Sequence, residues 1–169
     1  MIRLDPHGRF SHASRIGSFS RDGIARIASI SLLIERRILV DRLGFWDTAR
    51  FGADSEMIAR AIKLLGDKLV FQNELTMLCL DAAANLTNNP ETGIRLATGI
   101  SPVRVEYRDA WQAWHKATPI EQRKLPFPHV GQDRKFAIPE AMMVSDEAVD
   151  AIKTQVVLGD KLGKSDKVV

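Results

Sequence analysis

An unbroken apolar run, IASISLLI at residues 27–34, sets the strongest constraint on how this chain folds. The run is partly β-branched and does not alternate between polar and apolar residues, which is typical of a strand covered on both faces. It is far shorter than the roughly 18–20 residues that a membrane-spanning helix needs. A strand of this kind requires helices packed on both faces of its sheet, so the sequence predicts an α/β fold.

Composition limits the classes of protein to which the chain can belong. With 169 residues, 45% of them hydrophobic, it can bury the core of one domain. Its 24 basic residues are nearly balanced by 21 acidic ones, so the charge does not predict a nucleic-acid partner. Its single cysteine excludes an internal disulfide and a paired zinc motif, and favours a reducing compartment. Charged residues interrupt the first stretch before a signal peptide can form, so we expect a cytoplasmic protein without a transmembrane segment.

Local signals predict helices at three places. The segment ERRILVDRLG places apolar residues on one helical face and ends at Gly44. A second helix is predicted from Ser55 to Leu65, with Gly66 ending it, and a third begins at Ser101–Pro102 and runs to about Lys116. We also expect short extended segments at 69–72 and 75–80, and a short capped helix in SDEAVDAIKTQVVLG.

The acidic segment that opens the second of these helices is the strongest candidate for chemistry. It reads RFGADSEMIARAIKLLG at residues 50–66 and places Asp54 and Glu56 at the mouth of the helix. A carboxylate at a helix N-terminus is kept ionised by the helix dipole and the free backbone N–H groups, as a general base requires. The alternative interpretation is that Asp54 or Ser55 only caps the helix.

In its order of motifs, the run SISLLIERRILVDRLGFWDTARFGADSEMIARAIKLLG, residues 29–66, resembles the acceptor-side half of family 2 glycosyltransferases of the GT-A fold. The segments NLTNNPETGIRLATGISPVRVEYRDAWQAWHK and LPFP are similar to the C-terminal extension of bacterial members that build capsules and surface polysaccharides. The resemblance implies a partial GT-A-like, Rossmann-like sheet with flanking helices and a helical or extended C-terminal extension. It divides the chain into an N-terminal loop (1–23), a GT-A-like catalytic half (24–100), the extension (101–158) and a flexible tail (159–169).

The resemblance also implies roles for particular residues. Asp54 occupies the position of the acidic motif and would be the catalytic base, with Glu56 as an acceptor-binding or structural partner. Apart from the resemblance, Trp46 and Asp47 are candidates for a platform for the acceptor sugar, because aromatic faces pack on sugar rings, or Trp46 folds back onto the core. Arg36 and Arg37 are candidates for contact with a diphosphate, although a solvated helix start is the more common role of such residues.

Two stretches outside this motif favour packing over binding. Trp111, Trp114 and His115 have helical spacing, which is more often a packing stripe than a site. Met142 and Met143 are expected to fill the core.

The chain departs from the family at the donor site. It contains no Asp-X-Asp motif and no Gly-rich phosphate loop. The resemblance therefore implies that a nucleotide-sugar donor, and a manganese or magnesium ion, would bind only in a complete enzyme, while no cofactor and no metal ligands are expected in this chain alone. An apolar strand with few neighbours also predicts a homo-oligomer or a partner chain. The competing hypothesis is a non-catalytic interaction or scaffold module derived from a glycosyltransferase.

Overall fold

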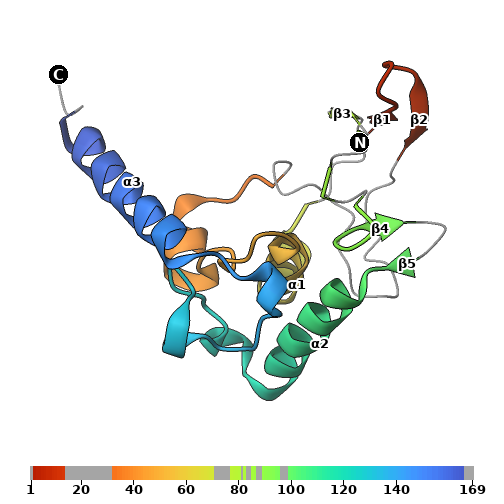
Figure 1. Cartoon of the computed structure of the whole chain (residues 1–169). Helices are drawn as coiled ribbons and strands as arrows, with labels where there is room; N and C mark the ends of the chain where they lie inside the picture. Colours follow the sequence, from red (N-terminus) through yellow and green to blue (C-terminus); the bar gives the residue numbers. More distant parts are fainter. Residues whose placement is uncertain are drawn as a thin grey trace.

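The computed structural model describes residues 2–13, 32–70, 77–80, 82, 85–86, 89–95 and 99–165 of the chain. Within these ranges the fold is mixed α/β, with a small three-stranded sheet, a two-stranded hairpin and several helices. The α/β class expected from sequence is therefore confirmed. In Figure 1 the strands lie on one side of helices α1 and α2, and helix α3 reaches away on the other side.

Along the chain, two groups of short strands are each followed by helical segments. The elements are β1 (Ile2–Leu4), β2 (Phe10–Ala13), the π-helical turn η2 (Ile38–Leu43), α1 (Ala53–Leu65), the 3₁₀ turn η3 (Gly66–Lys68), β3 (Leu78–Leu80), β4 (Ile94–Arg95), β5 (Gly99–Ile100), α2 (Pro102–Ala117), three 3₁₀ turns η4 (Ile120–Gln122), η5 (Gly131–Asp133) and η6 (Glu140–Met142), and α3 (Asp146–Ser165).

The first residues form strands, so the expectation of a loop over 1–23 is wrong for β1 and β2. The two strands pair antiparallel around a turn in which Asp5 accepts backbone N–H groups of His7 and Arg9, both at 2.9 Å. β3 then pairs with β1 in parallel, which gives the sheet order β2-β1-β3. Strands this short carry no sustained alternation, and this explains why the sequence pattern did not reveal them. The rest of that predicted loop, 14–23, lies outside the described residues.

The predicted buried strand at 27–34 falls mostly outside the described residues. Its last three residues, 32–34, are not in a strand, and the side chain of Leu33 is 99% exposed. The expectation of a covered strand is therefore wrong for this end of the run.

Glycines end the first two helical segments where the sequence placed them. Gly44 follows η2 with a φ of 76°, and its N–H donates to the carbonyl of Leu39 at 2.7 Å. A Cβ atom added to Gly44 would lie 2.3 Å from the carbonyl oxygen of Leu125, so both the backbone conformation and the close approach of the extension require glycine here. Gly66 ends α1 in the same way, with a φ of 51°.

Helices α2 and α3 begin where the sequence predicted, but α3 is longer than predicted. Ser101 is the N-cap of α2 and Pro102 is its first residue, as predicted, although the Ser101 hydroxyl makes no capping hydrogen bond. The segment between α2 and α3 is largely extended and is interrupted by the three 3₁₀ turns. α3 continues to Ser165, past the point at which the sequence predicted a tail.

Among the described residues, the buried core lies between α1, α2 and the segment that follows α2. One cluster joins the loop before α1 to α2 and to the segment that follows α2. It contains Phe51, Tyr107, Trp111, Trp114, Leu125, Phe136 and Met142. A second, around Leu43, Met57 and Ala61, packs η2 against α1. The packing role predicted for Trp111 and Trp114 is thus confirmed. Met142 is fully buried as expected, whereas Met143 is 53% exposed and the expectation for it is wrong.

Candidate functional site

Asp54 lies in the first turn of α1, at the second helical position. The helix begins at Ala53, two residues earlier than predicted, and its N-cap is Gly52, with a φ of 83° and no side-chain capping bond. The interpretation of Asp54 or Ser55 as the N-cap residue is therefore wrong. Asp54 is half-buried, so its carboxylate is neither enclosed in the core nor fully solvated.

Arg104 of α2 interacts electrostatically with Asp54. Burial of its guanidinium lowers the pKa of Arg104, and attraction to the Asp54 carboxylate partly offsets this by raising it. The guanidinium lies over the ring of Phe51, 5.0 Å from its centroid, and its Nε donates to the carbonyl of Thr92. An opposite charge favours the ionised form of a carboxylate, the form that accepts a proton.

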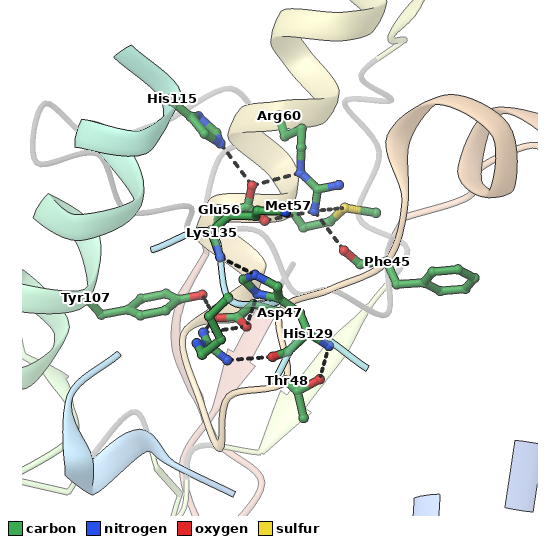
Figure 2. Close-up of polar contacts among 11 residues, drawn as sticks. Phe45, Asp47, Thr48, Glu56, Met57, Arg60, Tyr107, His115, His129 and Lys135 are labelled. Atoms are coloured by element: carbon green, nitrogen blue, oxygen red, sulfur yellow. Dashed lines mark hydrogen bonds and ion pairs between the residues drawn. The ribbon is translucent and has the colours of Figure 1, made fainter. Parts of the chain in front are cut away.

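The side chain of Glu56 points away from that of Asp54, because residues two positions apart in a helix lie about 200° apart around its axis. Its side chain is fully buried and accepts hydrogen bonds from Nε and Nη2 of Arg60, both at 2.8 Å. His115 of α2 adds a third contact, at 2.9 Å from its Nε2 to Oε1 (Figure 2). Arg60 in turn donates to the carbonyls of Leu43 and Phe45. Glu56 thus anchors α1 to α2 and to the loop that follows η2.

Asp47 is the centre of a second buried network, drawn below the first in Figure 2. Its Oδ2 accepts the hydroxyl of Tyr107 at 2.8 Å, and its Oδ1 contacts Nδ1 of His129 at 2.9 Å. Arg134 donates to both oxygens at 2.7 Å. Asp47 therefore ties the loop before α1 to α2 and to the segment that follows α2.

Protonation states in this network follow from its geometry. Burial raises the pKa of Asp47, but the bond from His129, the charge and bonds of Arg134 and the bond from Tyr107 together lower it below its ordinary value. Burial, followed by the charges of Asp47 and Glu56, raises the pKa of Tyr107 well above its ordinary value. The backbone N–H of Lys135 donates to Nε2 of His129 at 2.7 Å, so Nε2 is an acceptor and Nδ1 carries the proton that Asp47 accepts. Both nitrogens of His129 are therefore used within the protein.

The other two predicted substrate residues, Trp46 and Arg36, lie near η2. Trp46 is half-buried and packs against the cluster of η2 and α1, and its indole N–H is buried without a partner among the described residues. Arg36 is exposed at the start of the helical segment that leads into η2. The structure thus brings Asp47 and Glu56 into the interior, and leaves Asp54 and Arg36 with access to solvent.

In the described ranges, no group of three or more His, Cys, Asp or Glu side chains is placed to hold a metal ion. Over those ranges, too, each helix is too short or too polar to cross a membrane.

No protein-family model, curated protein or solved structure matches this chain. The assignment of a function therefore depends on the residues themselves and on the arrangement of Asp54, Arg104 and the two buried networks.

Several functional neighbours were not identified from sequence. One face of α2 supplies Arg104, Tyr107 and His115, each next to a different carboxylate of residues 47–56. The spacing of these three residues, three and then eight positions apart, indicates that they share one face of a helix, and this signal is present in the sequence. No local signal pointed to His129 and Arg134, because their partner Asp47 is more than 80 residues away in the chain.

Proposed function

We propose that this chain is the acceptor-side half of a GT-A glycosyltransferase, which transfers a sugar from a nucleotide-sugar donor to a saccharide acceptor. Asp54 is its general base. The observation that carries the proposal is the place of Asp54: it is half-buried in the first turn of α1, beside the Arg104 guanidinium, and it does not occupy the capping position. The order of sequence motifs around it supports the same family.

In the proposed reaction Asp54 takes the proton of an acceptor hydroxyl. The hydroxyl oxygen then forms a bond to the anomeric carbon of the donor sugar, and the bond between that carbon and the nucleoside diphosphate breaks. The diphosphate leaves with the bonding electron pair. Arg104 favours the ionised carboxylate before the transfer, and the Glu56 and Asp47 networks hold the helix start and the loop in place.

The donor-binding half, together with its metal ion, is assigned to another chain or to another part of a longer protein. Trp46 and Arg36 are the remaining candidates for contact with substrate, because each keeps some accessible surface. Asp47 and Glu56 support the site without touching substrate, because their carboxylate oxygens are bonded to side chains of the same chain.

A second candidate function is a non-catalytic interaction or scaffold module. It is favoured by the fact that two of the three carboxylates in the acidic region serve internal networks. The two functions differ in whether the Asp54 carboxylate is needed at a given level of folded protein.

The test uses an extract of cells from which the gene for this chain has been deleted, supplied with labelled nucleotide sugars and with purified chain. Restored incorporation of label into polysaccharide measures transfer. Asp54→Asn removes the proton acceptor and keeps the side-chain shape, so transfer should fall about 100-fold or more. Asp67→Asn, at an exposed position just after α1, is the matched control and should restore transfer fully. Full transfer with Asp54→Asn would favour the scaffold module.

A further inference from the structure

Arg60, Glu56 and His115 form a row that leads from the interior to the surface. The side chains of Arg60 and Glu56 are 1% and 0% exposed, whereas that of His115 is 11% exposed. The distances along the row are 2.8 Å from Arg60 Nε to Glu56 Oε1 and 2.9 Å from that oxygen to His115 Nε2. The imidazole is therefore the only member of the row with appreciable contact with solvent.

The bonds of Glu56 fix which nitrogen of His115 carries the proton. A carboxylate that is paired with a guanidinium is an acceptor only, so Nε2 of His115 must be the donor. In the neutral imidazole the other nitrogen, Nδ1, then has a free lone pair. Among the residues that the structure describes, none donates a hydrogen bond to Nδ1. His129 differs, because both of its nitrogens are bonded and its side chain is fully buried.

The surroundings of His115 select an uncharged partner. Arg60 and Glu56 behind it neutralise one another, so with a neutral imidazole the row presents no net charge that would attract an anion or a cation. The rings of Trp111 and Trp114 lie with centroids 5.0 Å from that of the imidazole and fix its orientation. An oriented lone pair at a neutral site is suited to the O–H group of a polyhydroxylated ligand.

We propose that Nδ1 of His115 accepts a hydrogen bond from a hydroxyl group of the saccharide acceptor. This inference rests on the proposed function and deepens it, because it assigns a hydroxyl-binding residue at the far end of α2 from Arg104. α2 carries Arg104 next to Asp54 in its first turn and His115 next to Glu56 in its last. His115 binds a part of the acceptor other than the hydroxyl group from which Asp54 takes the proton, because its neighbour Glu56 points away from Asp54.

Two substitutions separate this role from a purely structural one. In His115→Gln the side-chain amide reaches the position of Nε2, so it still donates to Glu56 but no longer offers an acceptor at Nδ1. In His115→Asn the shorter amide lies near the position of Nδ1, so an acceptor remains but the bond to Glu56 is lost. A structural role predicts that Asn is the more harmful change for both folding and binding, whereas the proposed role predicts that Gln is the more harmful for binding.

The experiment titrates the full ¹⁵N-labelled chain with the methyl α-glycosides of glucose, galactose and mannose, up to about 0.1 M because single-sugar affinities lie in the millimolar range. The imidazole nitrogens are observed by NMR. We expect the neutral Nε2–H tautomer for His115, the Nδ1–H tautomer for His129, and a selective shift of His115 Nδ1 with at least one glycoside. His115→Gln should weaken that binding about tenfold and change the melting temperature by less than about 2 °C. His115→Asn should melt lower and bind the glycoside more tightly than the Gln variant.

The inference is overturned by any of three results: no shift of His115 with any glycoside, the opposite tautomer at His115, or wild-type affinity in His115→Gln. The proposed function fails in a different experiment, the transfer assay with Asp54→Asn. Glycoside binding at His115 together with full transfer by Asp54→Asn would therefore keep this inference and reject the assigned base.

Discussion

Replacing Glu56 by Gln removes the negative charge from a deeply buried ion pair. Glu56 and Arg60 are 0% and 1% exposed, so the guanidinium would keep its charge in a site that water does not reach. Removing one partner of a buried pair typically costs about 3–5 kcal/mol. Two features favour the lower end of this range: Arg60 keeps its bonds to the carbonyls of Leu43 and Phe45, and the Gln oxygen still accepts one bond.

We therefore expect the free energy of unfolding of Glu56→Gln to fall by about 3 kcal/mol, out of a total of about 5–15 kcal/mol for a typical domain. With a urea m-value of about 2 kcal/mol/M, the midpoint of unfolding should move down by about 1.5 M. The fluorescence of Trp111 and Trp114, which lie against His115, reports the transition. Glu106→Gln, at an exposed position of α2, is the matched control and should change stability by less than about 0.5 kcal/mol.

The same variant also separates folding from chemistry. Glu56 is bonded within the protein and acts on the acceptor only through His115, so transfer per folded molecule at low urea should fall far less than in Asp54→Asn. A midpoint shift no larger than that of Glu106→Gln would refute the reasoning about the buried pair. A large loss of transfer with an unchanged midpoint would mean that Glu56, and not Asp54, acts on the substrate.

Three further predictions concern other parts of the molecule. Folding lowers the pKa of Asp47, so its contribution to stability is complete above the unfolded-state pKa and is lost as the pH falls through the folded-state pKa. In urea titrations between about pH 6 and 2, Asp47→Asn should therefore lose less stability with falling pH than the wild type. Equal slopes for the two proteins would contradict this. In thermal unfolding, Gly44→Ala should lower the free energy of unfolding by about 1–3 kcal/mol more than Gly131→Ala. Both glycines have a positive φ, but only at Gly44 would the added Cβ meet backbone atoms. Equal losses in the two variants would contradict the steric argument. The isolated chain should self-associate through the apolar side chains exposed on its sheet, because a second copy is the partner available in solution. In sedimentation velocity, Leu78→Ser should reduce this association more than Leu33→Ser does. A wild-type chain that stays monomeric at all concentrations would count against the prediction.

Much of the local structure could be predicted from sequence. Gly44, Gly66 and Pro102 set helix ends through their own backbone preferences, which act over a few residues and are visible in any context. The boundary that was wrong, at the start of α1, differs because Gly52 takes the capping position that Asp54 or Ser55 was expected to fill. Its left-handed conformation is accommodated where Met142 and Arg104 approach the backbone, and neither contact is visible locally.

The sequence by itself determined where the acidic helix lies and that Asp54 and Glu56 project from different sides of it, because helical periodicity is a property of the backbone alone. Only the tertiary structure decided which carboxylates are available for chemistry. Asp47 is buried by Tyr107, which is 60 residues away, and by His129 and Arg134, which are 82 and 87 residues away. Burial and the pairing of charges depend on segments that the folding of the whole chain brings together, and this is why two acids with similar local sequence signals came to lie inside the protein while Asp54 kept access to its surface.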